Sequence, residues 1–140
     1  MLTIIEKVIL LQGIDIFSEV PTEQLSALAA ITEEVSFTKD EEIFGENDYP
    51  DALYIVLEGQ IRLHRNGNEI AISKDHEAFG TWALLDDEPR VVGATSLVET
   101  RALRIDREEF IDLMADHVQI VQGILKRVVK RLRGLVGKVG

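Results

Sequence analysis

The chain has 140 residues, of which 46% are hydrophobic, so it carries enough apolar material to build the core of one domain. It contains no cysteine, which excludes disulfides, thiolate metal sites and cysteine nucleophiles. Its purely apolar runs are far shorter than the roughly 20 residues that cross a bilayer, and no signal-peptide pattern opens the sequence. We therefore expect a cytoplasmic protein that has no membrane partner.

The net charge of −10 is unevenly distributed along the chain. Residues 116–140 carry a local net charge of +5, which leaves −15 for residues 1–115. The six bases of this C-terminal segment are Lys126, Arg127, Lys130, Arg131, Arg133 and Lys138, and its one acid is Asp116. A body this acidic repels nucleic acid, so we expect no nucleic-acid partner for this domain.

Two helices are expected at the N-terminus. From Thr3 to Leu11 the apolar residues recur at helical spacing, and Gly13 follows the pattern. A second helical pattern begins near Pro21 or Thr22 and continues to Thr32.

From Val35 to Leu103 the sequence changes to short apolar runs separated by turn signals. The runs are "EVSF", "EIF", "ALYIVL", "GQIRLH", "EIAIS", "ATSLV" and "TRALRI". Asn66-Gly67 lies between two of them and is a strong hairpin signal. Short strands spaced about 8–12 residues apart favour an antiparallel sandwich or barrel.

Helical periodicity returns at Asp106. "DREEFIDLM" predicts a short helix capped by Asp106, with Glu109 at the capping-box position. A second helix with an apolar stripe is expected from near Asp116, and Gly134 and Gly137 weaken its last turns. The stripe consists of Val121, Ile124, Leu125, Val128, Leu132, Leu135 and Val139. Helices, then strands, then helices indicate an α+β domain with a β core.

The segment "EAFGTWALLDDEPRVVGAT", residues 77–95, departs from the strand pattern. Residues 81–85 suit one or two helical turns, with Gly80 relaxing the backbone before the first amides. Arg90 has two interpretations. Its guanidinium either makes a bidentate contact with an anion held by those amides or pairs on the surface with Asp86, Asp87 or Glu88.

The sequence resembles the cyclic nucleotide-binding domain family, of the type found in the catabolite activator protein and in regulatory subunits of the cyclic-AMP-dependent kinase. "LLQGIDIFSEVPTEQLSALA" resembles the family's helical opening, and "IFGENDYPDALYIVLEGQIRL" resembles its strand and glycine pattern. "FGTWALLDDEPRVV" is similar to the phosphate-binding cassette, usually written FGE(L/I)AL followed by PR(A/S)A.

The resemblance covers nearly the whole chain and implies one domain over residues 1–140, of the α+β class. N-terminal helices would occupy residues 1–34, and an antiparallel eight-stranded, jelly-roll-like β roll residues 35–105. The roll would contain the cassette at residues 79–92, and two C-terminal helices would occupy residues 106–140.

The resemblance also implies a ligand site in the cassette. Its residues would be Phe79, Gly80, Thr81, Trp82, Ala83, Arg90 and Val91. Gly80 and Ala83 would offer backbone amides to the cyclic phosphate, and Arg90 would pair with its exocyclic oxygen. Val91 lacks the hydroxyl that some relatives use on phosphate or guanine, which favours adenine and therefore cyclic AMP.

Two cassette residues depart from the family pattern. Thr81 replaces the usual glutamate that accepts a hydrogen bond from the ribose 2′-OH, and this change weakens cyclic AMP binding. Trp82 replaces an aliphatic residue and either fills the core behind the cassette or lies near the ligand. Outside the cassette, Asn47 and Pro50 occupy glycine positions; because Asn tolerates a left-handed conformation, we expect the turn before Tyr54 to survive.

Catalysis is not expected. His64, His76 and His117 lie apart without metal-site spacing, and the sequence has no nucleophile elbow, P-loop or dinucleotide-binding pattern. We therefore expect neither an enzyme nor a metal site.

The sequence predicts a regulatory domain that senses a cyclic nucleotide and signals through its C-terminal helices to an effector domain or partner. The alternative is a degenerate domain that serves as an interaction or dimerisation module. The last helix either packs its stripe on the β roll with its bases solvated, or forms a homodimer or docks on a partner; a third possibility is that its bases bind anionic lipid.

Overall fold

The computed structural model describes residues 1–137, so Lys138 and Val139, both counted in the C-terminal pattern, lie outside the described residues. The chain forms two units. Residues 31–110 form the strand unit, and residues 1–30 together with those from Ile111 onwards form the helical unit. The single-domain organisation over residues 1–140 stays a prediction.

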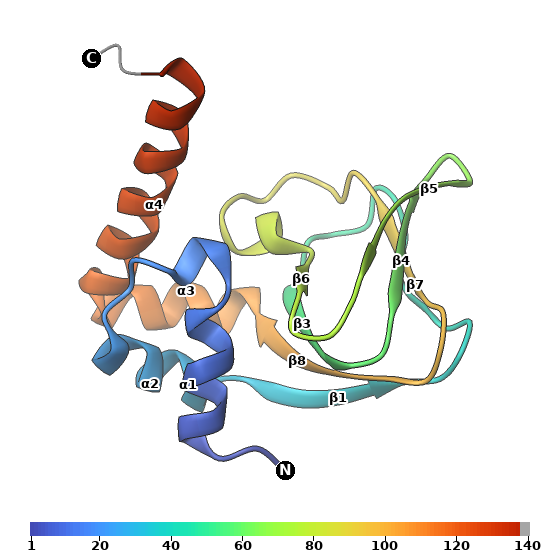
Figure 1. Ribbon diagram of the computed structural model, residues 1–140, viewed down its shortest axis with the longest axis horizontal. Coiled ribbons are helices and arrows are strands. Elements are labelled where there is room, and N and C mark those ends of the chain that lie inside the picture. Colours follow the sequence, from blue (N-terminus) through green and yellow to red (C-terminus); the bar gives the residue numbers. More distant parts are fainter. Residues whose placement is uncertain (138–140) are drawn as a thin grey trace. The chain divides into compact units, whose positions relative to one another are not determined.

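The strand unit contains eight strands in two antiparallel sheets. The strands are β1 (Glu33–Phe37), β2 (Glu42–Phe44), β3 (Ala52–Glu58), β4 (Ile61–Arg65), β5 (Asn68–Ser73), β6 (Ala78–Phe79), β7 (Gly93–Ser96) and β8 (Thr100–Asp106). One sheet has the order β1-β8-β3-β6 and the other β2-β7-β4-β5 (Figure 1). The predicted α+β class and eight antiparallel strands are confirmed. Only β6 was absent from the predicted runs, because two residues are too few to show alternation.

One buried cluster of this unit lies along one face of β3. Ala52, Tyr54 and Val56 alternate along the strand and pack with Phe44 and Phe79 in one buried cluster. The Tyr54 and Phe79 rings stack with centroids 5.1 Å apart. Phe44 and Phe79 of this cluster also line the candidate site.

Two turns follow the sequence prediction closely. Asn66 and Gly67 join β4 to β5 with φ angles of 53° and 79°, the pair of positive values that a type I′ hairpin requires. Asn47 adopts φ 68°, so asparagine supports the left-handed conformation at this family glycine position. The turn before Tyr54 therefore survives the departures from the family pattern.

The helical unit contains α1 (Ile4–Gln12), the short 3₁₀ helix η1 (Asp15–Phe17), α2 (Thr22–Ala30) and α4 (Val118–Val136). α1 begins at a capping box in which Thr3 and Glu6 bond each other's backbone amides. α3 (Arg107–Asp116) starts in the strand unit, where the Asp106 carboxylate accepts the Glu109 amide at 3.0 Å as predicted. None of the helices among residues 1–137 is long and apolar enough to cross a membrane.

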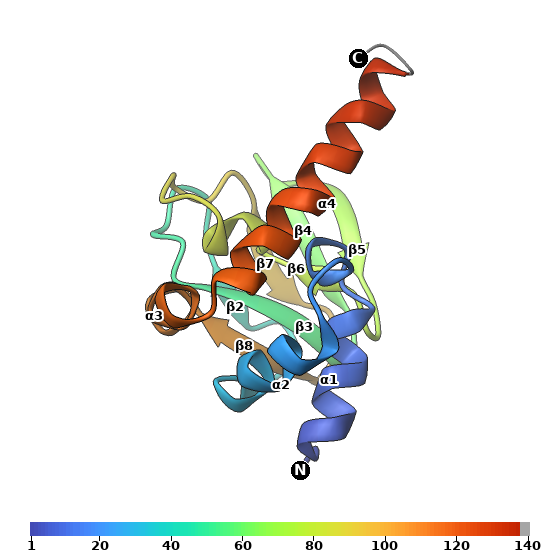
Figure 2. The same ribbon diagram turned by 90° about the vertical axis from the view of Figure 1, so that its left-hand side faces the viewer.

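The long helix α4 contacts η1 within the helical unit (Figure 2). Ile120, Gly123 and Ile124 are its buried residues. A Cβ on Gly123 would lie 2.8 Å from Val20 Cα, so only glycine permits this approach. Ile124 is therefore the buried member of the apolar stripe, whereas Leu125, Leu132 and Leu135 are exposed. Packing of the stripe on the β roll stays a prediction.

The bases of α4 are not simply solvated. Arg127 and Arg131 both pair with Asp15 of η1, at 2.7 Å and 3.3 Å. Lys130 pairs with Glu19. The basic face is therefore paired at these three positions, because Asp15 and Glu19 lie opposite them, and Lys130 and Arg131 stay exposed to solvent.

Candidate functional site

A cavity of about 750 Å³ opens in the strand unit, within the size range of ligand sites. It is lined by Phe44, Glu46, Asn47, Pro50, Leu63, Arg65, Ala78, Phe79, Gly80, Thr81, Trp82, Ala83, Asp86, Glu88, Pro89, Arg90, Val91 and Val92. All the residues that the sequence predicts for ligand binding are in this lining. The two-residue strand β6 carries the first of them, Phe79, and Arg90 lies in the loop before β7.

Gly80 reverses the chain between β6 and the short 3₁₀ helix η2 (Thr81–Leu84). Its φ of 72° lies in the left-handed region, and a Cβ there would come within 2.5 Å of Arg90 Nη1. Glycine is therefore required both for the turn and for the close approach of Arg90. The Ala83 amide, expected to face a phosphate, donates instead to the Gly80 carbonyl at 3.1 Å.

Arg90 is buried, with 7% of its surface exposed. Its Nη2 donates to the Ala52 carbonyl at 2.7 Å and to Asp51 Oδ1 at 3.1 Å. Its guanidinium carbon lies 3.8 Å from the centroid of the Phe44 ring, a cation–π contact. Surface pairing with the acidic run 86–88, one of the two interpretations of this arginine, is therefore wrong.

The guanidinium keeps one donor unused. Arg90 Nε is buried and has no hydrogen-bond partner among residues 1–137. Burial lowers the pKa of Arg90 below its ordinary value, and the hydrogen bond with Asp51 opposes that shift. Because an unsatisfied buried donor costs roughly 1–3 kcal/mol, this cation is suited to receive an additional acceptor.

Asp51 was not identified as a site residue from the sequence. Its second oxygen lies 3.4 Å from Arg104 Nη2, and Arg104 also pairs with Asp106 at 3.3 Å. The result is a chain of alternating charges that begins at Arg90 and ends at the start of α3. A single sequence contains no signal that joins Asp51 to an arginine 39 positions away.

The backbone fixes Arg90 against the loop before β3. Asn47 donates its amide to the Arg90 carbonyl at 2.7 Å, and the Arg90 amide donates to the Asp48 carbonyl at 2.9 Å. Asp48 in turn accepts the Gly45 amide at 2.7 Å. These bonds hold the arginine in place without using its guanidinium.

Arg107, at the first position of α3, was also not identified from the sequence. Its Nη1 donates to the Ala83 carbonyl at 2.8 Å and to the Asp86 carbonyl. Its own amide donates to the Asp51 carbonyl at 2.8 Å. Arg107 therefore joins the end of η2 to the start of α3 and to the loop that holds Asp51.

The two cassette residues that depart from the family pattern both line the cavity. Thr81 is half-buried. Trp82 is 64% exposed, so the expectation that it fills the core is wrong and the expectation that it lies at the ligand cavity is the one consistent with its position. The core position behind η2 is taken instead by Ala83 and Leu84, each 2% exposed.

The cavity lining carries charges of both signs. Arg65 accompanies Arg90, whereas Glu46, Asp86 and Glu88 contribute three acids. Acids in the lining oppose the approach of anions, and most strongly those with more than one negative charge.

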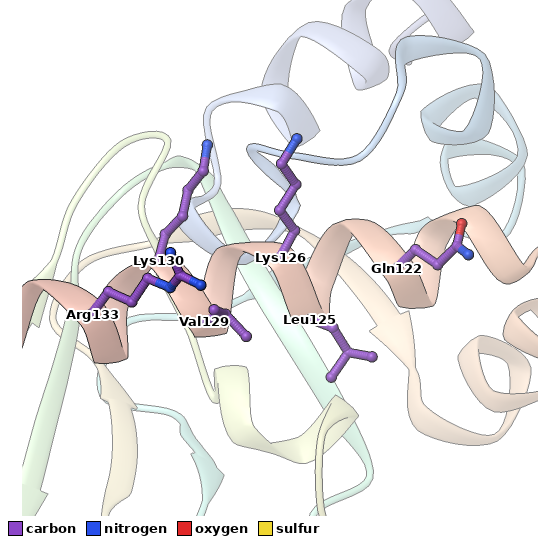
Figure 3. A pocket seen from close by; sticks show the side chains of 6 residues that line it. All are labelled: Gln122, Leu125, Lys126, Val129, Lys130 and Arg133. Carbon is purple, nitrogen blue, oxygen red and sulfur yellow. The ribbon is translucent and has the colours of Figure 1, made fainter. Parts of the chain in front are cut away.

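A second, shallower hollow of about 450 Å³ runs along α4. Figure 3 shows Leu125 and Val129 pointing to one side of the helix and Lys126 and Lys130 to the other. One helix supplies all of its lining, so no groups converge on a ligand there. Among residues 1–137 there is also no group of three or more His, Asp or Glu side chains that could hold a metal ion.

Comparison with known proteins places the chain in a family. Residues 34–117 match the family described as the cyclic nucleotide-binding domain. The CRP-like cAMP-activated global transcriptional regulator of Mycobacterium tuberculosis is 31% identical over 77% of this chain and 52% of its own length. The cAMP-dependent protein kinase regulatory subunit of Dictyostelium discoideum is 31% identical over 76% of this chain and 33% of its own.

The fold agrees with these similarities. The N-terminal domain of a transcriptional regulator from Streptomyces coelicolor A3(2) superposes with a TM-score of 0.83 at 28% identity, covering 90% of this chain and 94% of that one. The chain spans about half the length of the Mycobacterium relative and a third of the Dictyostelium one. Both of these curated relatives are named as regulatory proteins. The chain belongs to the cyclic nucleotide-binding domain family.

Proposed function

We propose that this chain is a ligand-sensing regulatory domain that binds cyclic AMP in the cavity beside Arg90. The observation that carries the proposal is a buried guanidinium with an unused Nε donor, in a cavity of about 750 Å³. The M. tuberculosis relative is described as cAMP-activated and the D. discoideum relative as cAMP-dependent.

The chemistry of the cavity suits a cyclic phosphate. A cyclic nucleotide carries one negative charge, which Arg90, the buried cation of the lining, balances. The Nε–H supplies a donor that no described residue uses, and Gly80 leaves the approach to Arg90 free of a side chain. Val91 offers no hydroxyl to a guanine, so adenine is the base that we propose.

Arg107 supports a route by which occupancy reaches the C-terminal helices. Its side chain holds the Ala83 and Asp86 carbonyls, and its backbone opens α3. A ligand that shifts η2 would therefore also displace Arg107, the first residue of α3. We propose that α3 and α4 pass this movement to an effector domain or protein partner.

Dimerisation through α4 belongs to the same proposal. Leu125, Leu132 and Leu135 are exposed on this helix, and a second copy would cover them. Sedimentation over a range of protein concentrations tests this point. A monomer at every concentration would contradict it.

A degenerate domain is the second candidate, and one observation favours it. Asp51 already supplies Arg90 with an internal counter-ion, while Thr81 lacks the carboxylate of the family glutamate. The acids of the cavity lining further oppose an incoming anion. In this case the fold would serve as an interaction module.

Titration of the single tryptophan's emission with cyclic AMP separates the two candidates. We expect a saturable change in the wild type that is lost in Arg90→Ala. Arg90→Lys keeps the charge without the forked donors, and we expect it to bind weakly while staying folded. Arg62→Lys is the matched control, because Arg62 lies on β4 and is not part of the cavity lining.

The proposal is contradicted if cyclic AMP, cyclic GMP and cyclic dinucleotides all leave both the emission and the melting temperature of the wild type unchanged. That result would support the degenerate domain.

A further inference from the structure

Trp82 is the aromatic residue of the cavity lining that the fold does not use. The other two rings of the lining are engaged: Phe44 lies under the Arg90 guanidinium, and Phe79 stacks on Tyr54. Both are buried, whereas Trp82 is 64% exposed. Within residues 1–137 its indole makes no ring contact and no hydrogen bond.

The geometry of η2 explains why this ring faces outwards. In a 3₁₀ helix successive residues are turned by about 120°, so neighbours face different directions. Ala83 and Leu84 are buried and anchor the turn in the core. Trp82 is thereby directed away from the core, on the part of η2 that borders the cavity.

An exposed indole in this position is unfavourable for folding alone. Burial of apolar surface contributes about 25 cal/mol per Å², and tryptophan has the largest side chain, so its exposure forgoes a stabilising contribution that a core position would provide. Trp82 instead contributes to the lining of a cavity that also contains a buried cation.

We propose that Trp82 recognises the base of the ligand by stacking, so that the site selects a singly charged anion joined to a planar aromatic ring. The inference rests on the proposed function for the anionic end, which Arg90 receives. The ring end is assigned to Trp82 from its exposure and its place in the lining. Asp86 and Glu88 in the lining disfavour a second negative charge on the ligand.

The test measures two ligands against two proteins by calorimetry, which does not depend on indole emission. The ligands are cyclic AMP and the base-free ribose 3′,5′-cyclic phosphate, and the proteins are wild type and Trp82→Ala. Stacking on an aromatic side chain has an effect of roughly 5- to 150-fold in affinity per base. We expect Trp82→Ala to weaken cyclic AMP binding by a factor in this range and to leave binding of the base-free ligand unchanged.

Trp82→Tyr should retain most of the affinity, because it keeps an aromatic face. Ile70→Ser is the matched control, because Ile70 is similarly exposed in the strand unit but lies outside the lining. The melting temperature of free Trp82→Ala should equal that of the wild type, since the side chain is mostly exposed.

The outcomes separate this inference from the function on which it rests. Equal cyclic AMP affinity of wild type and Trp82→Ala overturns the inference alone. An equal loss for both ligands also overturns it, because the effect would then not concern the base. No binding of cyclic AMP by the wild type overturns the proposed function and the inference together.

Discussion

Arg90 and Asp51 form an ion pair at 3.1 Å in which the arginine is buried and the carboxylate is exposed to solvent. The Arg90 side chain is 4% exposed, whereas the Asp51 side chain is 51% exposed. The pair therefore places a buried cation against a carboxylate that water still reaches. An incoming phosphate would meet an arginine that already has one anionic partner.

Replacement of Asp51 should change stability and anion affinity in opposite directions. Asp51→Asn leaves the buried guanidinium without its counter-ion, which we expect to lower stability by about 1–2 kcal/mol, discounted for the exposure of Asp51. It also removes an internal competitor, so cyclic AMP should raise the melting temperature more in the variant than in the wild type. Thermal unfolding with and without ligand checks both effects.

The control for Asp51 is Asp112→Asn, an exposed acid of α3 that loses the same charge. It should alter neither stability nor the ligand-induced shift. A ligand-induced shift in Asp51→Asn no larger than that of the wild type would show that Asp51 does not compete with the phosphate.

Thr81→Glu should strengthen cyclic AMP binding. By the family resemblance, the new carboxylate accepts a hydrogen bond from the ribose 2′-OH, and a hydrogen bond to a charged group contributes about 1.5–3 kcal/mol, or about 10- to 150-fold. The gain should be absent for 2′-deoxy cyclic AMP, which has no such hydroxyl. Thr81→Gln is the uncharged control, and a gain that is equal for both ligands would contradict the ribose contact.

Gly80→Ala should destabilise the strand unit more than the same change at Gly67. Both glycines have positive φ, 72° and 79°, so each substitution carries about 1–2 kcal/mol of left-handed strain. A Cβ at Gly80 also meets Arg90 Nη1 at 2.5 Å, whereas at Gly67 nothing lies within 4 Å. In denaturant unfolding, Gly80→Ala should therefore have a lower free energy of unfolding than Gly67→Ala. Equal losses of stability in the two variants would show that Arg90 moves aside freely.

Gly123→Ala should destabilise the helical unit although alanine is the better helix former. The added Cβ would lie 2.8 Å from Val20 Cα and 2.9 Å from the Glu19 carbonyl oxygen, both on backbone that cannot rotate away. Gly134→Ala meets nothing within 4 Å and should stabilise α4 by about 0.5–1 kcal/mol. Opposite shifts in melting temperature are expected, and a gain at Gly123 would contradict the close approach to Val20.

The Glu19–Lys130 pair should make the stability of the helical unit depend on pH in the acidic range. The hydrogen bond from Lys130 lowers the pKa of Glu19 below its ordinary value of 4.5, although desolvation opposes the shift. A lowered folded-state pKa stabilises the fold above pH 4.5, and this contribution is lost as the pH falls through the folded value. The melting temperature of Glu19→Gln should fall below that of the wild type at pH 7, and the gap should close in acid.

Glu23→Gln is the control for this titration, because Glu23 is an exposed acid of α2. It should leave the pH profile of the wild type unaltered. A gap between wild type and Glu19→Gln that stays constant down to acid unfolding would contradict the role of the ion pair.

Local patterns in the sequence were sufficient to predict the secondary-structure elements and the region of the site. Short apolar runs between turn signals predicted seven of the strands, the Asn66-Gly67 pair predicted the hairpin, and Asp106 predicted the start of α3. Each of these signals acts over a few residues, because turn, cap and pleat geometry depend on neighbouring φ and ψ angles. The cassette resemblance then led to the residues that line the cavity.

Only the tertiary structure decided which partners those residues have. Arg90 pairs with Asp51 and not with the acids two to four positions before it, because β3 and the loop beside Asn47 bring Asp51 to the buried guanidinium. The bases of α4 meet Asp15 and Glu19, more than 100 positions earlier in the chain. Trp82 lies outside the core because Ala83 and Leu84 already fill it. Contacts of this kind depend on how distant segments pack, and close packing is a property of the assembled fold that no local run of residues contains.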